Sequence, residues 1–338
     1  MGAIWLSTEE FFEGLSERIG YKSGLVLDAT DIRGLLKSEP AYEEYAALAE
    51  DDGLRIRSEV YEGVFEYLLF RVGRLESPVN LPPVAHAYHR YKNDKKKLKQ
   101  AMAIESHFTA FLEKALDSPE NKERKAIDPI PFILEMGKEF GASGMKMAFE
   151  AVDAFSLALF RSPWGVQFHH FENVIELRDL FNSEGLTPLY GKFIDQRYLD
   201  FLNRNFGAID SIHWRKFEGL TGEFFDRAGF CVELGPGRND EGVDVRVWPK
   251  AKAPDDPPAI IIQCKRQKEH VGKVVVKALY ADILSERAQS GLIVTTTRLS
   301  RGAKAVCTAR NYPIEEADRS TLKDWIGQLR KPGHGSFL

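Results

Sequence analysis

The stretches Gly242–Val245 (GVDV) and Ile261–Lys265 (IIQCK) decide the fold of the C-terminal part of this chain. Both are short apolar runs typical of β-strands, yet each carries polar residues that a buried strand does not normally contain. Side chains alternate between the two faces of a strand, so Asp244 is expected to point away from the valines beside it. Gln263 and Lys265 are two residues apart and are expected to share a face, with the cysteine between them on the other.

Helices and strands alternate around these two stretches. A helix is predicted over 212–228, with apolar residues recurring at helical spacing. Strands are predicted at 230–234, 243–248, 259–265, 291–297 and 313–317, and helices at 270–288, 300–310 and 320–329. Strand–helix–strand alternation in the second half of this part implies a mixed sheet with helices on both faces.

The first 205 residues or so have a different pattern, which is mostly helical. Ser7 and Glu10 have the spacing of a capping box in front of an apolar stripe. Further helices are predicted at 54–74, 95–116, 131–140, 143–160, 171–182 and 194–205. The expected fold class is α+β overall: a mostly helical domain over residues 1–208, and an α/β domain over residues 209–338 with a mixed central sheet flanked by helices.

Composition excludes several classes of protein. Of the 338 residues, 43% are hydrophobic and 28% charged, which is ordinary for a globular protein. Three cysteines and no apolar N-terminal signal favour a reducing cytoplasm over a disulfide framework, and no apolar run is long enough for a membrane span. The net charge is −4, but residues 211–338 hold 21 Lys and Arg against 16 Asp and Glu, which gives weak support for a polyanion partner.

The polar residues of the two strands indicate a kind of chemistry. An aspartate, a glutamine and a lysine that converge at strand ends can hold a metal ion and a water molecule. Hydrolysis of a phosphodiester needs both, because charge on the phosphoryl oxygens must be neutralised and a water activated. Mg²⁺ prefers oxygen ligands and keeps several waters, so one or two carboxylates are enough to bind it. The strand-end residues therefore indicate phosphodiester cleavage.

An ordered set of residues resembles the Mrr-type restriction endonuclease family. The resemblance covers about residues 214–326 and depends on the order of the whole set, since an aspartate followed by Gln-x-Lys would be weak evidence alone. The matching positions are Phe217-Glu218, Gly229-Phe230, Gly242-Val243-Asp244, Gln263-Cys264-Lys265, Gly291–Thr297, Ser300, Ala303 and Leu322.

The resemblance implies a fold of the restriction-endonuclease type and roles for the polar residues. Asp244 would be the first ligand of Mg²⁺, for which Mn²⁺ can substitute, and the backbone carbonyl of Cys264 the next. Gln263 offers a neutral oxygen where the wider superfamily has a carboxylate, which lowers the charge of the site. Glu218, reaching from the preceding helix, would restore that charge. Lys265 would orient the attacking water or stabilise the developing negative charge.

Basic residues around the predicted strand ends are candidates for DNA contacts. Arg266, Lys268 and Lys273 follow the Gln-x-Lys strand and are expected to open a helix, where cations suit a phosphate. Arg298 and Arg301 follow the next strand, and residues 239–241 could help to hold a metal. Each of these sets also has a plainer interpretation as a solvated surface. A basic, aromatic segment at 86–99 is better explained as a solvated helix face than as a nucleic-acid site.

The sequence therefore predicts a Mg²⁺-dependent DNA endonuclease that serves in restriction or anti-phage defence. DNA is the expected partner, no membrane is involved, and a homodimer or higher oligomer would allow both strands to be cut. Residues 1–208 would select the target, mediate assembly or sense a signal, and a protein partner could bind to this part of the chain. Two alternatives stay open: a non-cutting DNA-binding or interaction protein that retains the nuclease fold, and a structure-selective repair nuclease.

Overall fold

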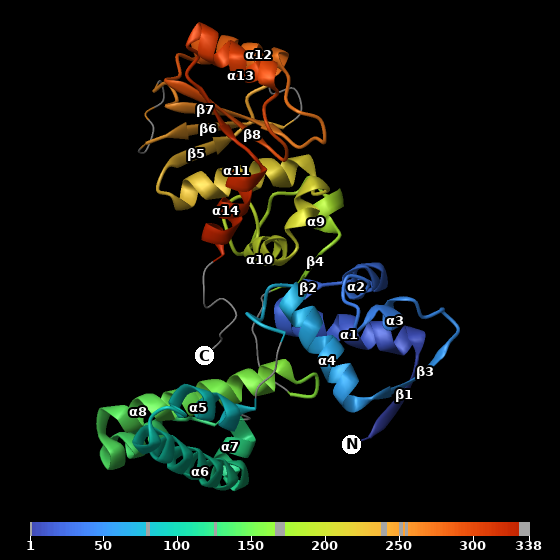
Figure 1. Cartoon of the computed structure of the whole chain (residues 1–338), viewed down its shortest axis with the longest axis vertical. Helices are drawn as coiled ribbons and strands as arrows, with labels where there is room; N and C mark the ends of the chain where they lie inside the picture. Colours follow the sequence, from blue (N-terminus) through green and yellow to red (C-terminus); the bar gives the residue numbers. More distant parts are fainter. Residues whose placement is uncertain are drawn as a thin grey trace.

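A computed structural model describes residues 2–78, 82–124, 127–165, 173–237, 242–249, 253 and 256–330. Figure 1 shows three parts: a sheet with helices on both sides at the top, an N-terminal lobe at the right, and a bundle of long helices below. Within the described residues, no helix combines the length and the apolar character that a membrane span requires.

The N-terminal lobe packs helices beside a two-stranded antiparallel ribbon. Its elements are β1 (Ala3–Ser7), α1 (Thr8–Ser23), β2 (Leu25–Val26), α2 (Ala29–Leu36), α3 (Glu43–Ala46), β3 (Gly53–Arg57) and α4 (Ser58–Arg71). The predicted capping box is confirmed, because Glu10 N–H donates to Ser7 Oγ at 3.1 Å and Ser7 N–H donates to Glu10 Oε2 at 2.7 Å.

The predicted helix over 54–74 is wrong in its first residues, which form β3 instead. Leu54 and Ile56 are buried and alternate with exposed neighbours, which is the period of a strand. Because β3 pairs with β1, these residues are extended, and α4 begins only at Ser58.

The helical bundle has a hydrophobic core of its own. It consists of α5 (Pro83–Tyr91), α6 (Lys95–Asp117), α7 (Pro119–Arg124) and α8 (Ile130–Arg161). Phe108, Phe132 and Met136 lie in this core. The two helices predicted at 131–140 and 143–160 are the two halves of α8, which breaks at Gly141 (φ 70°, ψ −161°).

The predicted helix over 171–182 is wrong within the described residues. The chain there forms β4 (Ile175–Glu176), which pairs in parallel with β2, and the single turn α9 (Asp179–Asn182). Residues Leu177 and Leu180 are buried in the core, so tertiary pairing and packing outweigh the helical spacing of this segment.

The C-terminal part contains a five-stranded mixed sheet in the order β5-β6-β7-β8-β9, which confirms the predicted fold class. The pairs β5–β6 and β6–β7 are antiparallel, and β7–β8 and β8–β9 are parallel. Its elements are α10 (Gln196–Arg204), the 3₁₀ helix η1 (Phe206–Asp210), α11 (Trp214–Arg227), β5 (Cys231–Leu234), β6 (Val245–Trp248), β7 (Ile260–Lys265), α12 (Lys273–Glu286), β8 (Ser290–Thr295), α13 (Arg301–Arg310), β9 (Ile314–Ala317) and α14 (Arg319–Leu329).

Helices cover both faces of this sheet (Figure 1). On one face, α11 and α14 pack on Val245 and its neighbours; on the other, α12 and α13 pack on Ile261. The expectation that Val243 shares a face with Val245 is wrong, because Val243 belongs to the α12 side. The reason is that β6 begins only at Val245, so the strict alternation of a strand does not yet apply at Val243.

One continuous core joins the sheet to the N-terminal lobe through α10. Leu199 and Leu202 on α10 belong to the same cluster as Leu68 of α4 and Leu329 of α14. Division of the chain at 208/209 into two domains stays a prediction.

Candidate active site

Asp244 directly precedes β6, and hydrogen bonds tie it to β7. Val245 pairs with Ile262 in the antiparallel ladder, and Asp244 N–H also donates to the Ile262 carbonyl, at 3.0 Å. The Asp244 carboxylate turns toward the next residues of β7, where Oδ2 accepts a hydrogen bond from the Cys264 N–H at 2.6 Å. Asp244 is only 7% exposed, so its charge lies at a largely buried end of the sheet.

Gln263 is also buried, at 6% exposure. Its Oε1 atom receives no hydrogen bond from any residue that the structure describes. Gly242 has φ +94°, and a Cβ there would lie 3.3 Å from Gln263 Nε2, so glycine allows the backbone to pass close to the amide. A buried amide oxygen without a donor costs free energy unless another partner, such as a cation, satisfies it.

Asp282 on α12 is a further carboxylate near this amide, and it was not predicted from the sequence. The same Cβ position at Gly242 lies 3.9 Å from Asp282 Oδ2. The position of Asp282 in the helix could have indicated it. Asp282 follows the buried Leu279 by three residues and precedes the buried Ile283, and residues three apart on a helix lie on the same side.

Glu218 approaches from α11, on the other face of the sheet. It is 5% exposed, and its Oε2 accepts from Arg215 NH1 at 2.7 Å. Thr221, three residues further along α11, has its Oγ1 3.5 Å from Cys264 Sγ. Burial, together with the charges of Asp244 and Glu218, raises the pKa of the Cys264 thiol well above its usual value. The thiol is therefore protonated, and the two carboxylates lie near the same point of β7.

Lys265 ends β7 and is half-buried on the same face as Gln263. Its carbonyl accepts from Thr295 Oγ1 at 2.8 Å, which ties the end of β7 to the end of β8. No hydrogen bond or ion pair to its ammonium group comes from the described part of the chain. Asp244, Gln263 and Lys265 thus lie around the end of β7, and Glu218 approaches Cys264 from the α11 side. That the four residues act together stays a prediction.

This set of donors fits a hard divalent cation. In the part of the chain that the structure describes, no three His, Cys, Asp or Glu side chains are grouped closely enough to hold a metal. Mg²⁺ does not require such a group, because it keeps several waters and is commonly bound by one or two carboxylates. Asp244 and Glu218 supply carboxylates. Gln263 supplies a neutral oxygen, Oε1, to which no described residue donates.

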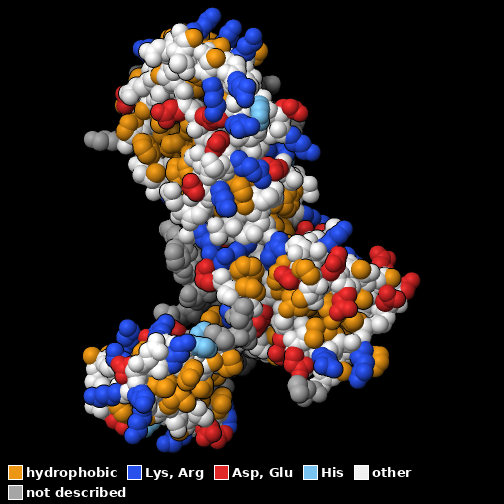
Figure 2. All heavy atoms as spheres, viewed as in Figure 1, with side chains coloured by type: hydrophobic (Ala, Val, Ile, Leu, Met, Phe, Trp, Pro, Cys, Tyr) orange, Lys and Arg blue, Asp and Glu red, His pale blue; other side chains and the backbone are white. Residues whose placement is uncertain are grey.

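The predicted DNA-contacting residues Arg266, Lys268, Lys273, Arg298 and Arg301 are all exposed. The expectation that the first two open a helix is wrong, since α12 begins only at Lys273. They lie in the connection between β7 and α12. A β-bridge between Val271 and Leu299 joins this connection to the one that follows β8. Figure 2 shows Lys and Arg side chains on the visible face of the sheet-containing part.

Some of these cations already have partners within the protein. Arg266 NH1 donates to the Asp210 carbonyl at 2.8 Å, and Arg298 Nε lies 3.3 Å from His270 Nε2. Residues 239–241, which were considered as additional metal ligands, lie outside the described residues.

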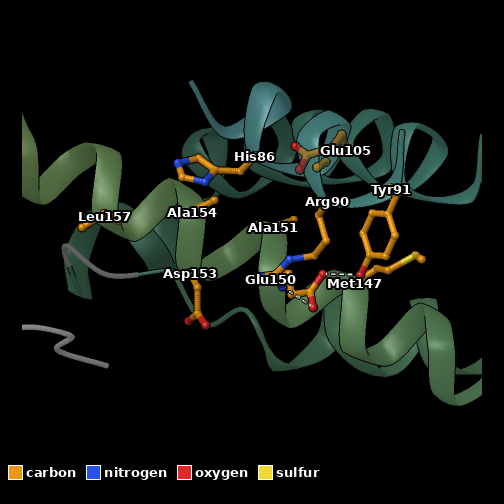
Figure 3. Close-up of a pocket in the computed structure, with 12 residues that line it drawn as sticks. His86, Arg90, Tyr91, Glu105, Met147, Glu150, Ala151, Asp153, Ala154 and Leu157 are labelled. Atoms are coloured by element: carbon orange, nitrogen blue, oxygen red, sulfur yellow. Dashed lines mark hydrogen bonds and ion pairs between the residues drawn. The ribbon is translucent and has the colours of Figure 1, made fainter. Parts of the chain in front are cut away.

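A separate cavity of about 220 Å³ lies in the helical bundle, lined by α5, α6 and α8. Figure 3 shows Arg90 and Tyr91 directed at Glu150, which accepts from both at 2.6 Å. His86 and Arg90 belong to the basic segment at 86–99, so part of that segment lines a cavity rather than only a solvated face.

Residues 209–326 match a family model described as restriction endonuclease, of the Mrr catalytic type. The C-terminal part of the chain is therefore a restriction-endonuclease domain of this type, and the domain is consistent with a DNA nuclease.

Two individual proteins are similar to parts of the chain. An uncharacterized protein, y4cE, of Sinorhizobium fredii (strain NBRC 101917 / NGR234) is 32% identical over 149 residues, which are 44% of this chain and 34% of that protein. A solved structure of the MspJI restriction endonuclease in complex with a 27-mer oligonucleotide is 20% identical, with a TM-score of 0.29, and the match covers 41% of this chain and 32% of that one. The chain thus spans about a third of the length of each.

Proposed function

We propose that this chain is a Mg²⁺-dependent endonuclease that hydrolyses phosphodiester bonds in DNA. The observation that carries the proposal is that Asp244 accepts a hydrogen bond from the N–H of Cys264, which lies between Gln263 and Lys265 on β7, and that the charges of Asp244 and Glu218 both act on the Cys264 thiol. The match of residues 209–326 to the restriction endonuclease family supports the same chemistry.

The metal-binding role falls to the oxygen donors of this site. Asp244, Glu218, the amide oxygen of Gln263 and the backbone carbonyl of Cys264 would hold Mg²⁺, and Mn²⁺ would substitute. When bound, the cation neutralises charge on the phosphoryl oxygens and makes a bound water a better nucleophile. The Cys264 N–H fixes the Asp244 carboxylate at the strand end, so this ligand needs little reorganisation on binding.

Lys265 acts on the phosphate and the water. Its ammonium group donates hydrogen bonds, which position the attacking water and stabilise the negative charge that develops on the phosphoryl oxygens. The anchoring of its carbonyl by Thr295 holds the start of this side chain in place.

The surrounding cations would bind the DNA backbone. Arg266, Lys268, Lys273, Arg298 and Arg301 are exposed around the ends of β7 and β8, where they suit contacts to phosphates. Such contacts position the duplex and do not read its sequence. Two copies of the chain would cut both strands, and residues 1–208 would select the target, mediate assembly or sense a signal in restriction or anti-phage defence.

Incubation of supercoiled plasmid with the full-length protein tests this function. With Mg²⁺, we expect nicked and linear products, which EDTA prevents and which the Asp244→Asn variant does not form. Methylated and unmethylated plasmids are compared side by side to reveal dependence on a modified base. Absence of cleavage on every substrate with both Mg²⁺ and Mn²⁺ would contradict the proposal.

A second candidate function is DNA binding without cleavage. The observation in its favour is that Arg215 already pairs with Glu218 and that Gln263 is neutral, so this set of residues offers little negative charge to a cation. Retention of duplex DNA by a protein that never cuts it with Mg²⁺ or Mn²⁺ would favour this candidate.

A further inference from the structure

Helix α11 carries two arginine–glutamate pairs with the same distance of 2.7 Å but with different surroundings. In the pair of Arg227 with Glu223, the carboxylate also accepts from the backbone N–H groups of Lys192 and Phe193, at 2.9 and 2.8 Å. Arg227 in turn donates to the Leu329 carbonyl at 3.0 Å. This pair joins α11 to neighbouring segments and has a structural role.

The pair of Arg215 with Glu218 lies at the candidate active site instead. Glu218 is 5% exposed and the side chain of Arg215 is 17% exposed, so water screens this pair only weakly. Gly237 lies against this guanidinium, because a Cβ at that position would be 3.5 Å from Arg215 Cζ. The φ of +92° at Gly237 favours glycine, which lets this backbone lie against the guanidinium.

The charges explain why this pair matters for metal binding. The carboxylates of Asp244 and Glu218 are balanced by Lys265 and Arg215, so these four residues carry no net formal charge. A divalent cation that approaches Glu218 in the free protein meets a guanidinium already bound to it, and like charges at this range repel strongly in a buried site. A DNA phosphate offers the same guanidinium an alternative partner, since arginine binds phosphate through two parallel hydrogen bonds.

We propose that Arg215 is a positioning residue that makes metal loading depend on DNA. In the free protein it neutralises Glu218 and keeps cation affinity low. When duplex DNA binds, a phosphate takes the guanidinium and Glu218 becomes available as a ligand. The inference rests on the proposed function, because it assumes that Glu218 serves the metal. Such coupling is reciprocal, so the cation also tightens DNA binding.

Titration calorimetry of the full-length protein with Mn²⁺, without DNA, tests the first half of this proposal. We expect Arg215→Gln to bind Mn²⁺ on the order of tenfold more tightly than the unmodified protein. Arg215→Lys, which retains the charge, should stay close to the unmodified affinity. In the double variant Arg215→Gln/Glu218→Gln, the gain should vanish, because the carboxylate that the arginine masks is no longer present.

Arg227→Gln is the matched control, since it removes the arginine of the other pair on the same helix. It should lower the melting temperature and leave Mn²⁺ affinity unchanged. Thermal melts of all variants verify that they are folded. An equal gain in Mn²⁺ affinity for Arg227→Gln and Arg215→Gln would overturn the proposal, because the effect would then be one of overall charge.

Asp244→Asn separates this proposal from the proposed function. If Mn²⁺ binding depends on Asp244 but Arg215→Gln does not tighten it, the role of Arg215 is wrong and the metal site stands. If Asp244→Asn leaves Mn²⁺ binding unchanged, both in the unmodified protein and in Arg215→Gln, both proposals fail.

Fluorescence anisotropy of a labelled duplex in EDTA tests the second half. Arg215→Gln should weaken DNA binding several-fold, and Arg227→Gln should not. Equal DNA affinity of Arg215→Gln and the unmodified protein would contradict the transfer of this guanidinium to a phosphate.

Discussion

The Asp244 carboxylate accepts a hydrogen bond from the backbone N–H of Cys264 at 2.6 Å, and this contact connects the start of β6 to the end of β7. The aspartate therefore has two functions that a substitution can separate. Its oxygen satisfies a backbone donor, and in the proposed function its charge binds the cation.

Asp244→Asn should abolish cleavage and preserve the fold. The amide oxygen of asparagine can still accept from the Cys264 N–H, whereas the negative charge is lost. Asp244→Ala should lose activity equally and also cost about 1–3 kcal/mol of stability, because it removes the acceptor of that N–H. Plasmid cleavage and urea denaturation measure the two effects; full activity in Asp244→Asn would refute the assignment of this residue.

Lys265→Ala should reduce the cleavage rate by about 10²–10³-fold or more, because a charged donor to the developing negative charge is removed. Its stability should change little, since the side chain is half-buried and no described residue pairs with its ammonium group. Single-turnover cleavage at saturating protein separates this effect from DNA binding. A variant that cuts at the original rate would exclude Lys265 from the chemistry.

Glu218→Gln tests whether Glu218 compensates for the neutral Gln263. The glutamine retains the shape and an acceptor for Arg215 but not the charge, so a higher Mg²⁺ concentration should be needed for half-maximal cleavage. The measurement is a Mg²⁺ titration of the cleavage rate. Unchanged metal dependence would mean that the compensation argument is wrong even if the protein is a nuclease.

Asp195 and Arg197 form a buried pair, with Arg197 Nε 2.8 Å from Asp195 Oδ1, and should make stability depend on acid. Burial opposes ionisation of Asp195, but hydrogen bonds and the charge of Arg197 outweigh it and lower the pKa of this carboxyl below its usual value of 3.8. The pair therefore stabilises the fold fully above about pH 4, and the contribution is lost as pH falls through the lowered pKa.

Asp195→Asn should cost about 3–5 kcal/mol near neutral pH, because a buried arginine loses its counter-charge. Chemical denaturation of both proteins at several pH values measures the difference, which should shrink below about pH 4. A difference that is independent of pH down to the acid unfolding of the protein would contradict the role of this charge.

A fragment over residues 209–338 should be less stable than one over residues 186–338. Only the longer fragment retains α10, whose Leu199 and Leu202 pack in the core with Leu329 and whose Gln196 donates to the Leu329 carbonyl at 3.2 Å. Thermal melting of the two purified fragments measures this contribution. Equal melting temperatures would show that the restriction-endonuclease domain does not need α10.

The C-terminal sheet could be predicted well because its signals are local. Alternation in runs such as Ile260–Lys265 and apolar spacing along the helix at 214–227 arise within single elements. The two segments of the N-terminal part that were wrongly predicted as helix lie where distant segments decide the outcome. Residues 53–57 became a strand through pairing with β1, and residues 175–176 through pairing with β2.

The sequence alone determined which residue types are present at the strand ends and in which order, and this order was enough to predict the sheet and the restriction-endonuclease type of the domain. The nuclease chemistry stays a prediction. Only the tertiary structure decided what surrounds the strand-end residues. The pairing of Glu218 with Arg215, the proximity of Asp282 to the Gln263 amide and the lack of a donor to Gln263 Oε1 among the described residues depend on how α11 and α12 pack on opposite faces of one sheet. Such contacts join side chains from separate elements, and spacing along the chain does not encode their distances.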